Sequence, residues 1–307
     1  MKERAEAMVM ASFAADSLAL GAHWIYDVDE IERRFGRVET FLKPSPDSYH
    51  PAKEAGDFTH YGDQTMVLLE SIAESGEFDL EDFSRRWRKL FSDYRGYFDH
   101  ATKGTLQGFE QGKGPSESGS HSTDLAGAAR IAPIVYRYRE DLPSLISAAR
   151  SQTAMTHNNA SVIQAADFLA RVTHEILAGS APVQTMKTLA DGLFKGEPVA
   201  SAVNEGLESL GLSPKDAIIE FGQSCSVKGA FPAVVYLIAR YENDLKEALV
   251  QNTMAGGDSA ARGMAVGMVL GAYGGMEAIP GDWLDAMKAG RRIRDLLTRI
   301  ETSVRGN

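Results

Sequence analysis

Two aspartates, Asp63 and Asp258, directly follow glycines at positions where the sequence predicts the start of a helix. A hydroxyl side chain stands close to each of them, Thr65 in the first segment and Ser259 in the second. Carboxylate and hydroxyl oxygens gathered at two helix N-termini would suit a hard cation such as Mg²⁺, which takes oxygen ligands. The same residues also serve as ordinary N-caps. The local sequence alone favours this structural role.

Several histidines and the single cysteine are further candidates for chemistry. His60 and His121 each stand three residues before an acid, a spacing that a transition metal accepts but that is too common to be specific. His157 precedes a predicted helix, where it either packs over the helix start or faces a site. Cys225 lies between two serines, and we predict a buried, inert thiol there. The sequence has no nucleophile elbow, phosphate-binding loop or Cys-x-x-Cys pair.

The helix predicted after Asp258 carries a glycine at every fourth residue, at Gly263, Gly267, Gly271 and Gly275. Each interior glycine costs a helix about 1 kcal/mol relative to alanine, so a tertiary contact must offset the cost. A ridge without side chains allows another backbone to approach closely. The remaining faces are apolar, and we therefore predict that this helix is the buried centre of the fold.

Composition limits the classes of partner and compartment. The chain has 307 residues and a formal net charge of −10, which argues against nucleic acid and anionic membranes as partners. One cysteine excludes a disulfide framework and suits a reducing compartment. Acidic residues in the first helix argue against a signal peptide, and we find no apolar run of the ~18 residues that a membrane span needs. We expect a cytoplasmic protein.

Helical periodicity dominates the chain, and little of it alternates as strands do. Prolines forbid a regular element from 37 to 62, and a loop of this length is usually functional or disordered. Glycine and proline breaks separate the later helices, but none of them is long enough for a domain linker. The sequence therefore predicts one all-α domain over 1–307, a compact orthogonal helical bundle.

The order of motifs resembles the ADP-ribosylglycohydrolase family along nearly the whole chain. Each matching segment is weak by itself, but their order is the family's. The segments are Ala15-Asp16-Ser17-Leu18 with Gly21, Gly62-Asp63-Gln64-Thr65, Ser122 to Arg130 with Pro133, Thr156-His157, Gly256 to Ala261, Gly271 to Gly274, and Ile279-Pro280. The segments 22–27 and 60–64 are similar to the branch that includes the J-type lens crystallins of jellyfish.

This resemblance implies a set of site residues. The family binds two Mg²⁺ ions through both aspartate motifs, and the ions hold a ribose and a water while the bond at the anomeric carbon breaks. The implied catalytic residues are Asp63 and Asp258, and the implied metal ligands are Asp63, Thr65, Asp258 and Ser259. The implied substrate-binding residues are Asp16, His60, Gln64, Ser122, Asp124 and His157.

The chain departs from the family pattern at two carboxylates, where it has Gln64 and Ala260. Two aspartates balance only half the charge of two Mg²⁺ ions, and unpaired charge in a desolvated site is expensive. We therefore expect weak Mg²⁺ binding, a single ion, or none. Asp124 also stands where the family has a glycine beside the diphosphate.

Two functions from different classes remain open. The first is a hydrolase that cleaves an N- or O-glycosidic bond of ADP-ribose or a related nucleoside. The second is a catalytically inactive relative that acts as a ligand-binding or structural, crystallin-like protein. We favour the enzyme because a carboxylate is retained at both helix starts. We expect the Asp63 and Asp258 carboxylates to share an ion or a water, and a small nucleotide or ADP-ribose-like molecule as the partner.

Overall fold

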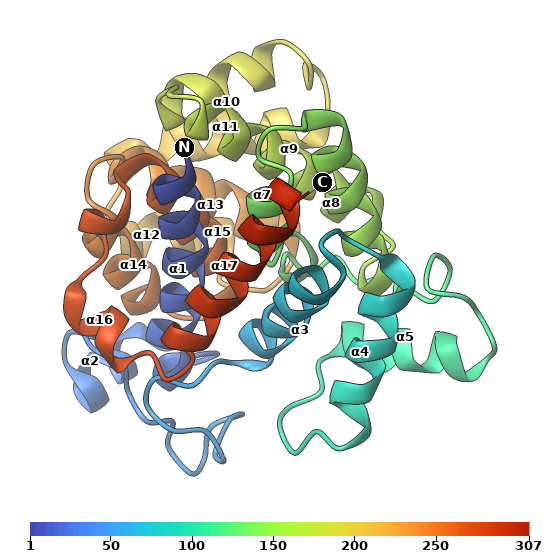
Figure 1. Cartoon of the computed structure of the whole chain (residues 1–307). Coiled ribbons are helices and arrows are strands. Elements are labelled where there is room, and N and C mark those ends of the chain that lie inside the picture. Colours follow the sequence, from blue (N-terminus) through green and yellow to red (C-terminus); the bar gives the residue numbers. More distant parts are fainter. Residues whose placement is uncertain (307) are drawn as a thin grey trace.

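The computed structural model describes residues 1–306, which form helices joined by loops without a β-strand (Figure 1). The helices, in chain order, are α1 (Lys2–Ala19), η1 (Leu20–Ala22), α2 (Val28–Phe35), α3 (His60–Ser75), α4 (Leu80–Ser92), α5 (His100–Glu110), α6 (Ala126–Ala129), α7 (Ala132–Arg137), α8 (Leu142–Thr156), α9 (Ala160–Leu177), α10 (Pro182–Asp191), α11 (Pro198–Glu208), η2 (Ser209–Gly211), α12 (Pro214–Phe221), α13 (Val227–Arg240), α14 (Leu245–Met254), α15 (Ser259–Gly274), η3 (Met276–Ala278), α16 (Gly281–Ala286) and α17 (Gly290–Gly306). The prediction of an all-α fold is confirmed.

The glycine ridge of α15 packs directly against the backbone of α1. A Cβ added at Gly267 would lie 2.6 Å from the carbonyl oxygen of Ala11, and one at Gly271 would lie 2.9 Å from that of Ala7. Both helices are buried almost throughout and lie side by side in opposite directions, and α9, α13 and α14 also contact α15. The predicted central helix is therefore confirmed, although Gly275 lies just beyond it as a C-cap with φ of 73°.

Side-chain caps mark the start of several helices. Asp27, Asn159 and Asp258 each accept hydrogen bonds from the first turn of the helix that follows. The prediction that a helix starts at Asp63 is wrong, because α3 begins three residues earlier, at His60, with Thr59 as its N-cap. The helix can start there because Thr59 has the extended backbone angles of an N-cap and its hydroxyl accepts from the N–H of Tyr61. The prolines and glycines of the preceding loop end before this residue.

The segment Lys2–Ala22 has the length and mean hydropathy of a membrane span, contrary to our expectation that no such run exists. In the structure, 94% of this window is buried inside the fold. It is the core helix α1 with η1, and its apolar surface is covered mainly by α15.

Candidate active site

Loops from distant parts of the sequence meet at the N-terminal end of α15 and are joined by backbone hydrogen bonds. The N–H of Leu125 donates to the carbonyl of Cys225 over 2.8 Å, and the N–H of Asp258 donates to that of Gln223 over 2.9 Å. The N–H of Trp24 donates to the carbonyl of Gly257, also over 2.9 Å. These bonds fix the relative positions of the loops that carry the side chains described next.

Gly257 makes this close approach possible. Its φ is +66°, in the left-handed region, and a Cβ there would lie 2.1 Å from the carbonyl oxygen of Gln223. The following residue, Asp258, then caps α15 by accepting from the N–H of Ala261 over 3.3 Å. The glycine turn thus places the Asp258 carboxylate at the mouth of the central helix.

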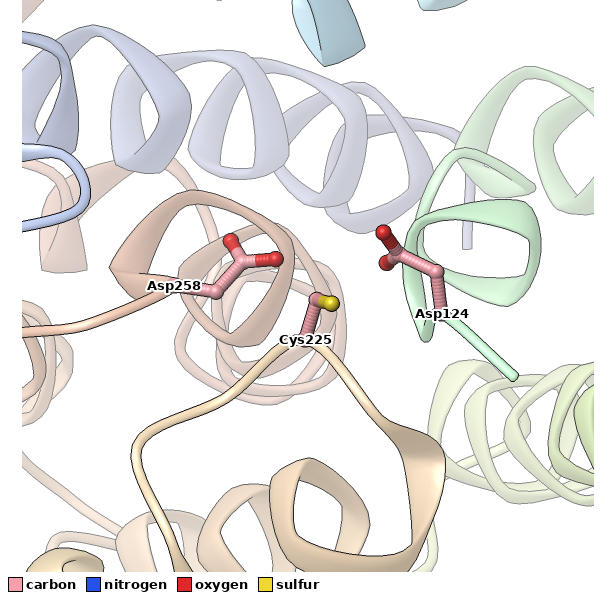
Figure 2. Close-up of side chains that lie close together, drawn as sticks. All are labelled: Asp124, Cys225 and Asp258. Carbon is pink, nitrogen blue, oxygen red and sulfur yellow. The ribbon is translucent and has the colours of Figure 1, made fainter. Parts of the chain in front are cut away.

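Asp124, Cys225 and Asp258 converge at this point and are called the Asp–Cys–Asp cluster below. Figure 2 shows the three side chains pointing toward one another from three separate segments, and one oxygen of each carboxylate and the Cys225 sulfur lie within 4.8 Å of one another. Both aspartates are buried, whereas Cys225 is partly exposed. Of the described residues, these three are a group that could hold a metal ion.

Tyr61 connects the two carboxylates of the cluster. Its hydroxyl lies 3.1 Å from Oδ2 of Asp258 and 3.4 Å from Oδ2 of Asp124. The other oxygen of Asp124 accepts from the N–H of Ala126, the first residue of the short helix α6, over 2.9 Å. The hydroxyl of Ser122 accepts from the N–H of Asp124 over 3.2 Å, so Ser122 shapes the loop beside the cluster.

Burial and mutual repulsion perturb the titration of the cluster. Burial, followed by the charge of Asp258, raises the pKa of Asp124 well above its usual range. Burial also raises the pKa of Asp258, but the nearby Arg262 guanidinium and the N–H of Ala261 oppose the rise. Burial and the two carboxylates raise the pKa of the Cys225 thiol. The two buried carboxyl groups therefore hold a proton between them more firmly than isolated carboxyl groups would.

His23 faces the cluster from the loop after η1. Its Nδ1 lies 3.8 Å from Oδ1 of Asp258, and its side chain is fully buried. Neither ring nitrogen has a hydrogen-bond partner in the described part of the chain. Burial lowers the pKa of His23 well below its usual value, so the imidazole is neutral. The next residue, Trp24, has a φ of 65°, a strained backbone for a non-glycine residue.

The structure places Asp63 away from Asp258. Its Oδ2 accepts from Nζ of Lys53 and from the hydroxyl of Tyr94, each over 2.6 Å. Tyr61, which reaches Asp258, stands only two residues before Asp63 on α3, so their side chains leave the helix on different sides. The carboxylate that lies beside Asp258 is Asp124, not Asp63 as we expected.

The proposed Mg²⁺ ligands are consequently not gathered in one place. The hydroxyl of Thr65 donates to the carbonyl of Tyr61 within α3. Asp63 is already paired with the ammonium of Lys53. Ser259 is buried next to Asp258, and its hydroxyl has no partner among the described residues. This donor set does not fit the Mg²⁺ site that the sequence predicted.

Asp16 and His60 hold α3 in position. Asp16 is fully buried and accepts from the N–H of Thr59 over 2.7 Å and from its hydroxyl over 2.6 Å. Nδ1 of His60 lies 3.1 Å from Nε2 of His50, and its Nε2 lies 3.1 Å from Oδ2 of Asp99. These two predicted substrate-binding residues thus contact other protein groups and support the segment that carries Tyr61.

Gln64 and His157 belong to a second buried network around Arg130. The side-chain oxygen of Gln64 accepts from Arg130 and from the indole of Trp87, each over 2.8 Å. Arg130 also donates to the hydroxyl of Thr156, which lies 2.8 Å from Nδ1 of His157. Gln64 stands where the family resemblance led us to expect an aspartate, and its side-chain oxygen provides a hydrogen-bond acceptor for the buried guanidinium of Arg130.

Sequence reasoning missed Cys225 and His23 as members of the site. Cys225 lies about one hundred residues from Asp124 and more than thirty from Asp258, so no local spacing indicates the contact. Two signals in the sequence could have indicated these residues. Cys225 is the single cysteine of the chain, and His23 lies in the segment 22–27 that resembles one branch of the family.

Comparison with known proteins identifies the family of this chain. The ADP-ribosylglycohydrolase family matches across residues 1–307. The chain belongs to this family. It is 25% identical to Crystallin J1A of Tripedalia cystophora over 95% of its own length and 94% of the crystallin. It is 23% identical to the ADP-ribosylhydrolase ARH3 of Gallus gallus over 81% of its length and 79% of that protein.

Solved structures agree with this assignment. An ADP-ribosylglycohydrolase-related protein complex contains a chain that superimposes with a TM-score of 0.79 at 25% sequence identity, covering 99% of both chains. The fold predicted from the resemblance, an all-α bundle of the ADP-ribosylglycohydrolase type, is thus confirmed.

Proposed function

We propose that this chain hydrolyses a glycosidic bond at the ribose of an ADP-ribose-like substrate. The family and the relative named ADP-ribosylhydrolase support the class of substrate. The observation that carries the proposal is the pairing of two buried carboxyl groups, Asp124 and Asp258, through the hydroxyl of Tyr61. Glycosidases commonly use two carboxyl groups, one as acid and the other as base or nucleophile.

The environments of the two carboxyl groups assign their roles. Burial and the adjacent Asp258 raise the pKa of Asp124, and we assign to Asp124 the acid that donates a proton to the leaving group. Asp258 keeps its carboxylate form more readily, since Arg262 and the N–H of Ala261 stabilise the charge, and it accepts a proton from the attacking water. Tyr61 orients both groups.

A hollow near the cluster is the proposed place for part of the substrate, and His23, which lies 3.8 Å from Asp258, is the residue that links the two. The hollow has a volume of about 230 Å³, and His23, Trp24 and Tyr26 contribute to its lining. Tyr26 is 50% exposed, and the exposed Tyr49 packs edge-on against Trp24 with ring centroids 4.8 Å apart. Aromatic faces of this kind stack on bases and sugars. The proposed site therefore combines a stacking surface with an acid–base pair.

The test is a direct assay of bond cleavage. The full-length chain is incubated with ADP-ribosylated peptides that carry either an N-glycosidic or an O-glycosidic linkage, and released ADP-ribose is measured by mass spectrometry. We expect release from at least one linkage. Absence of release from both, at enzyme concentrations comparable to the substrate, would contradict the proposed activity.

A ligand-binding or structural role is the second candidate, and the similarity to Crystallin J1A favours it. The pairing of Asp63 with Lys53 supports it as well, because this carboxylate is already neutralised within the protein. In this case the chain would bind ADP-ribose in calorimetry, or remain stable without ligand, while cleaving none of the peptides.

A further inference from the structure

We propose that the Asp–Cys–Asp cluster binds a borderline-soft divalent cation such as Zn²⁺, and that His23, which lies outside this group of three but faces Asp258, moves in as a fourth ligand. The site uses the two carboxylates of the proposed hydrolysis, but binding of the cation does not depend on whether the chain is an enzyme.

The donor atoms of the cluster suit zinc better than magnesium. A sulfur and two carboxylate oxygens lie within 4.8 Å of one another on three loops. A tetrahedral zinc with ligands at about 2.0–2.3 Å brings neighbouring donor atoms to about 3.3–3.7 Å, so the side chains would close by about 1 Å. Thiolate ligands select zinc and softer ions, whereas Mg²⁺ requires an octahedral shell of oxygens.

His23 is the second and independent indication of a ligand. Both of its ring nitrogens are buried without a hydrogen-bond partner among the described residues. Burial of an unpaired polar group is costly, so an orphaned imidazole at this depth requires an explanation. Its Nδ1 lies 3.8 Å from Oδ1 of Asp258, close to the separation of two ligands on one zinc ion. A cation held by Asp258 would satisfy this nitrogen.

The nearby arginines do not neutralise the cluster through direct contacts. Arg262 donates to the carbonyl of Gly256 over 2.6 Å and to Asn252 over 3.1 Å. Arg130 donates to Gln64 and to side chains of α8. In residues 1–306, neither guanidinium has a hydrogen bond to an aspartate of the cluster. Buried carboxylates normally pair with a cation, and neither arginine supplies that pairing to Asp124 or Asp258 through a direct contact.

A bound cation would also affect the proposed hydrolysis. Both carboxylates would then be metal ligands, and neither could carry a proton to or from the substrate. Zn²⁺ is therefore expected to inhibit the enzyme at about one equivalent. If the chain proves inactive in all hydrolysis assays, the binding measurements below still decide the metal proposal.

The test uses Co²⁺ as a spectroscopic substitute for Zn²⁺. The full chain, freed of metal with a chelator, is titrated with Co²⁺ under reducing conditions. We expect a thiolate-to-cobalt charge-transfer band in the near ultraviolet that saturates at one equivalent and disappears when Zn²⁺ is added. Because Cys225 is the single cysteine in the sequence, such a band reports on this residue alone.

Variants separate the site from adventitious binding. Cys225→Ser should abolish the charge-transfer band and weaken Zn²⁺ at least about tenfold, and His23→Gln should weaken Zn²⁺ as well. Asp29→Asn removes an exposed carboxylate of α2 and should change neither measurement. Because Cys225 is partly exposed, we expect Cys225→Ser to fold, and its melting temperature checks this. Absence of the band in the folded wild-type chain, or equal Zn²⁺ affinity in Cys225→Ser, would overturn the proposal.

Discussion

Asp16 is a buried carboxylate that supports the site without belonging to it. It lies on α1 and ties the N-cap Thr59 of α3 to the central helix through two hydrogen bonds. Burial is the largest influence on it and raises its pKa to about 6. The charged form is therefore less favourable in the folded chain than in the unfolded chain, whose carboxylate titrates near 3.8.

The raised pKa of Asp16 predicts a specific dependence of stability on pH. Its favourable contribution is complete below about pH 4 and is lost as pH rises through about 6, because the folded state holds the proton longer. The shift corresponds to about 3 kcal/mol. Between about pH 4 and about pH 7, the free energy of unfolding of the wild type should fall by roughly this amount relative to Asp16→Asn. Chemical denaturation measures the free energy of unfolding of the wild type and of Asp16→Asn at each pH. A difference between the two proteins that stays constant from about pH 4 to about pH 7 would contradict the raised pKa of Asp16.

At the scale of elements, the contact between α1 and α15 organises the molecule. It depends on the absence of side chains at Gly267 and Gly271, where the ridge of α15 meets the carbonyl groups of α1. Because Asp258 caps the same helix, a displacement of α15 would also move the candidate site.

Substitution of Gly267 tests this contact. We expect Gly267→Leu to lower the free energy of unfolding by about 3 kcal/mol or more, since its Cβ would already lie 2.6 Å from the carbonyl oxygen of Ala11. Gly281→Ala is a matched control, because a Cβ there meets nothing within 4 Å. Guanidinium denaturation compares the two. Equal stability of Gly267→Leu and the wild type would show that the helices do not pack in this way.

At the scale of the whole molecule, loops that are distant in sequence behave as one unit around the cluster. The N–H groups of Trp24, Leu125 and Asp258 each donate to a carbonyl group on another loop. We expect their hydrogen exchange to be slow, because exchange requires separation of two loops. The exposed turn at 112–114 is the reference for fast exchange. Fast exchange at all three positions would show that the loops move independently.

The sequence predicted those features whose causes are local. The cap residue Asp258 acts on the turn that follows it, and the spacing of the glycines in α15 already implies a close helix contact. The neighbours of Asp63 could not be predicted, because Lys53 reaches it from a proline-rich loop without regular structure.

The composition of the cluster was also beyond local reasoning. Its three side chains stand on loops that are brought together by the packing of α6, α13 and α15, and only the folded chain shows that Asp124 faces Asp258. The family resemblance led us to expect the Asp63 carboxylate beside Asp258, whereas the structure places that of Asp124 there.

The most direct test of the proposed catalytic pair compares the contributions of Asp63, Asp124 and Asp258 to catalysis. For a substrate that the wild type cleaves, kcat/KM is measured for Asp124→Asn, Asp258→Asn and Asp63→Asn, with melting temperatures to confirm folding. We predict that the first two lose at least about 100-fold, the size expected for removal of a catalytic acid or base, whereas Asp63→Asn stays within about threefold of the wild type. A loss in Asp63→Asn equal to that in Asp258→Asn, with activity retained in Asp124→Asn, would contradict the assignment of the catalytic pair.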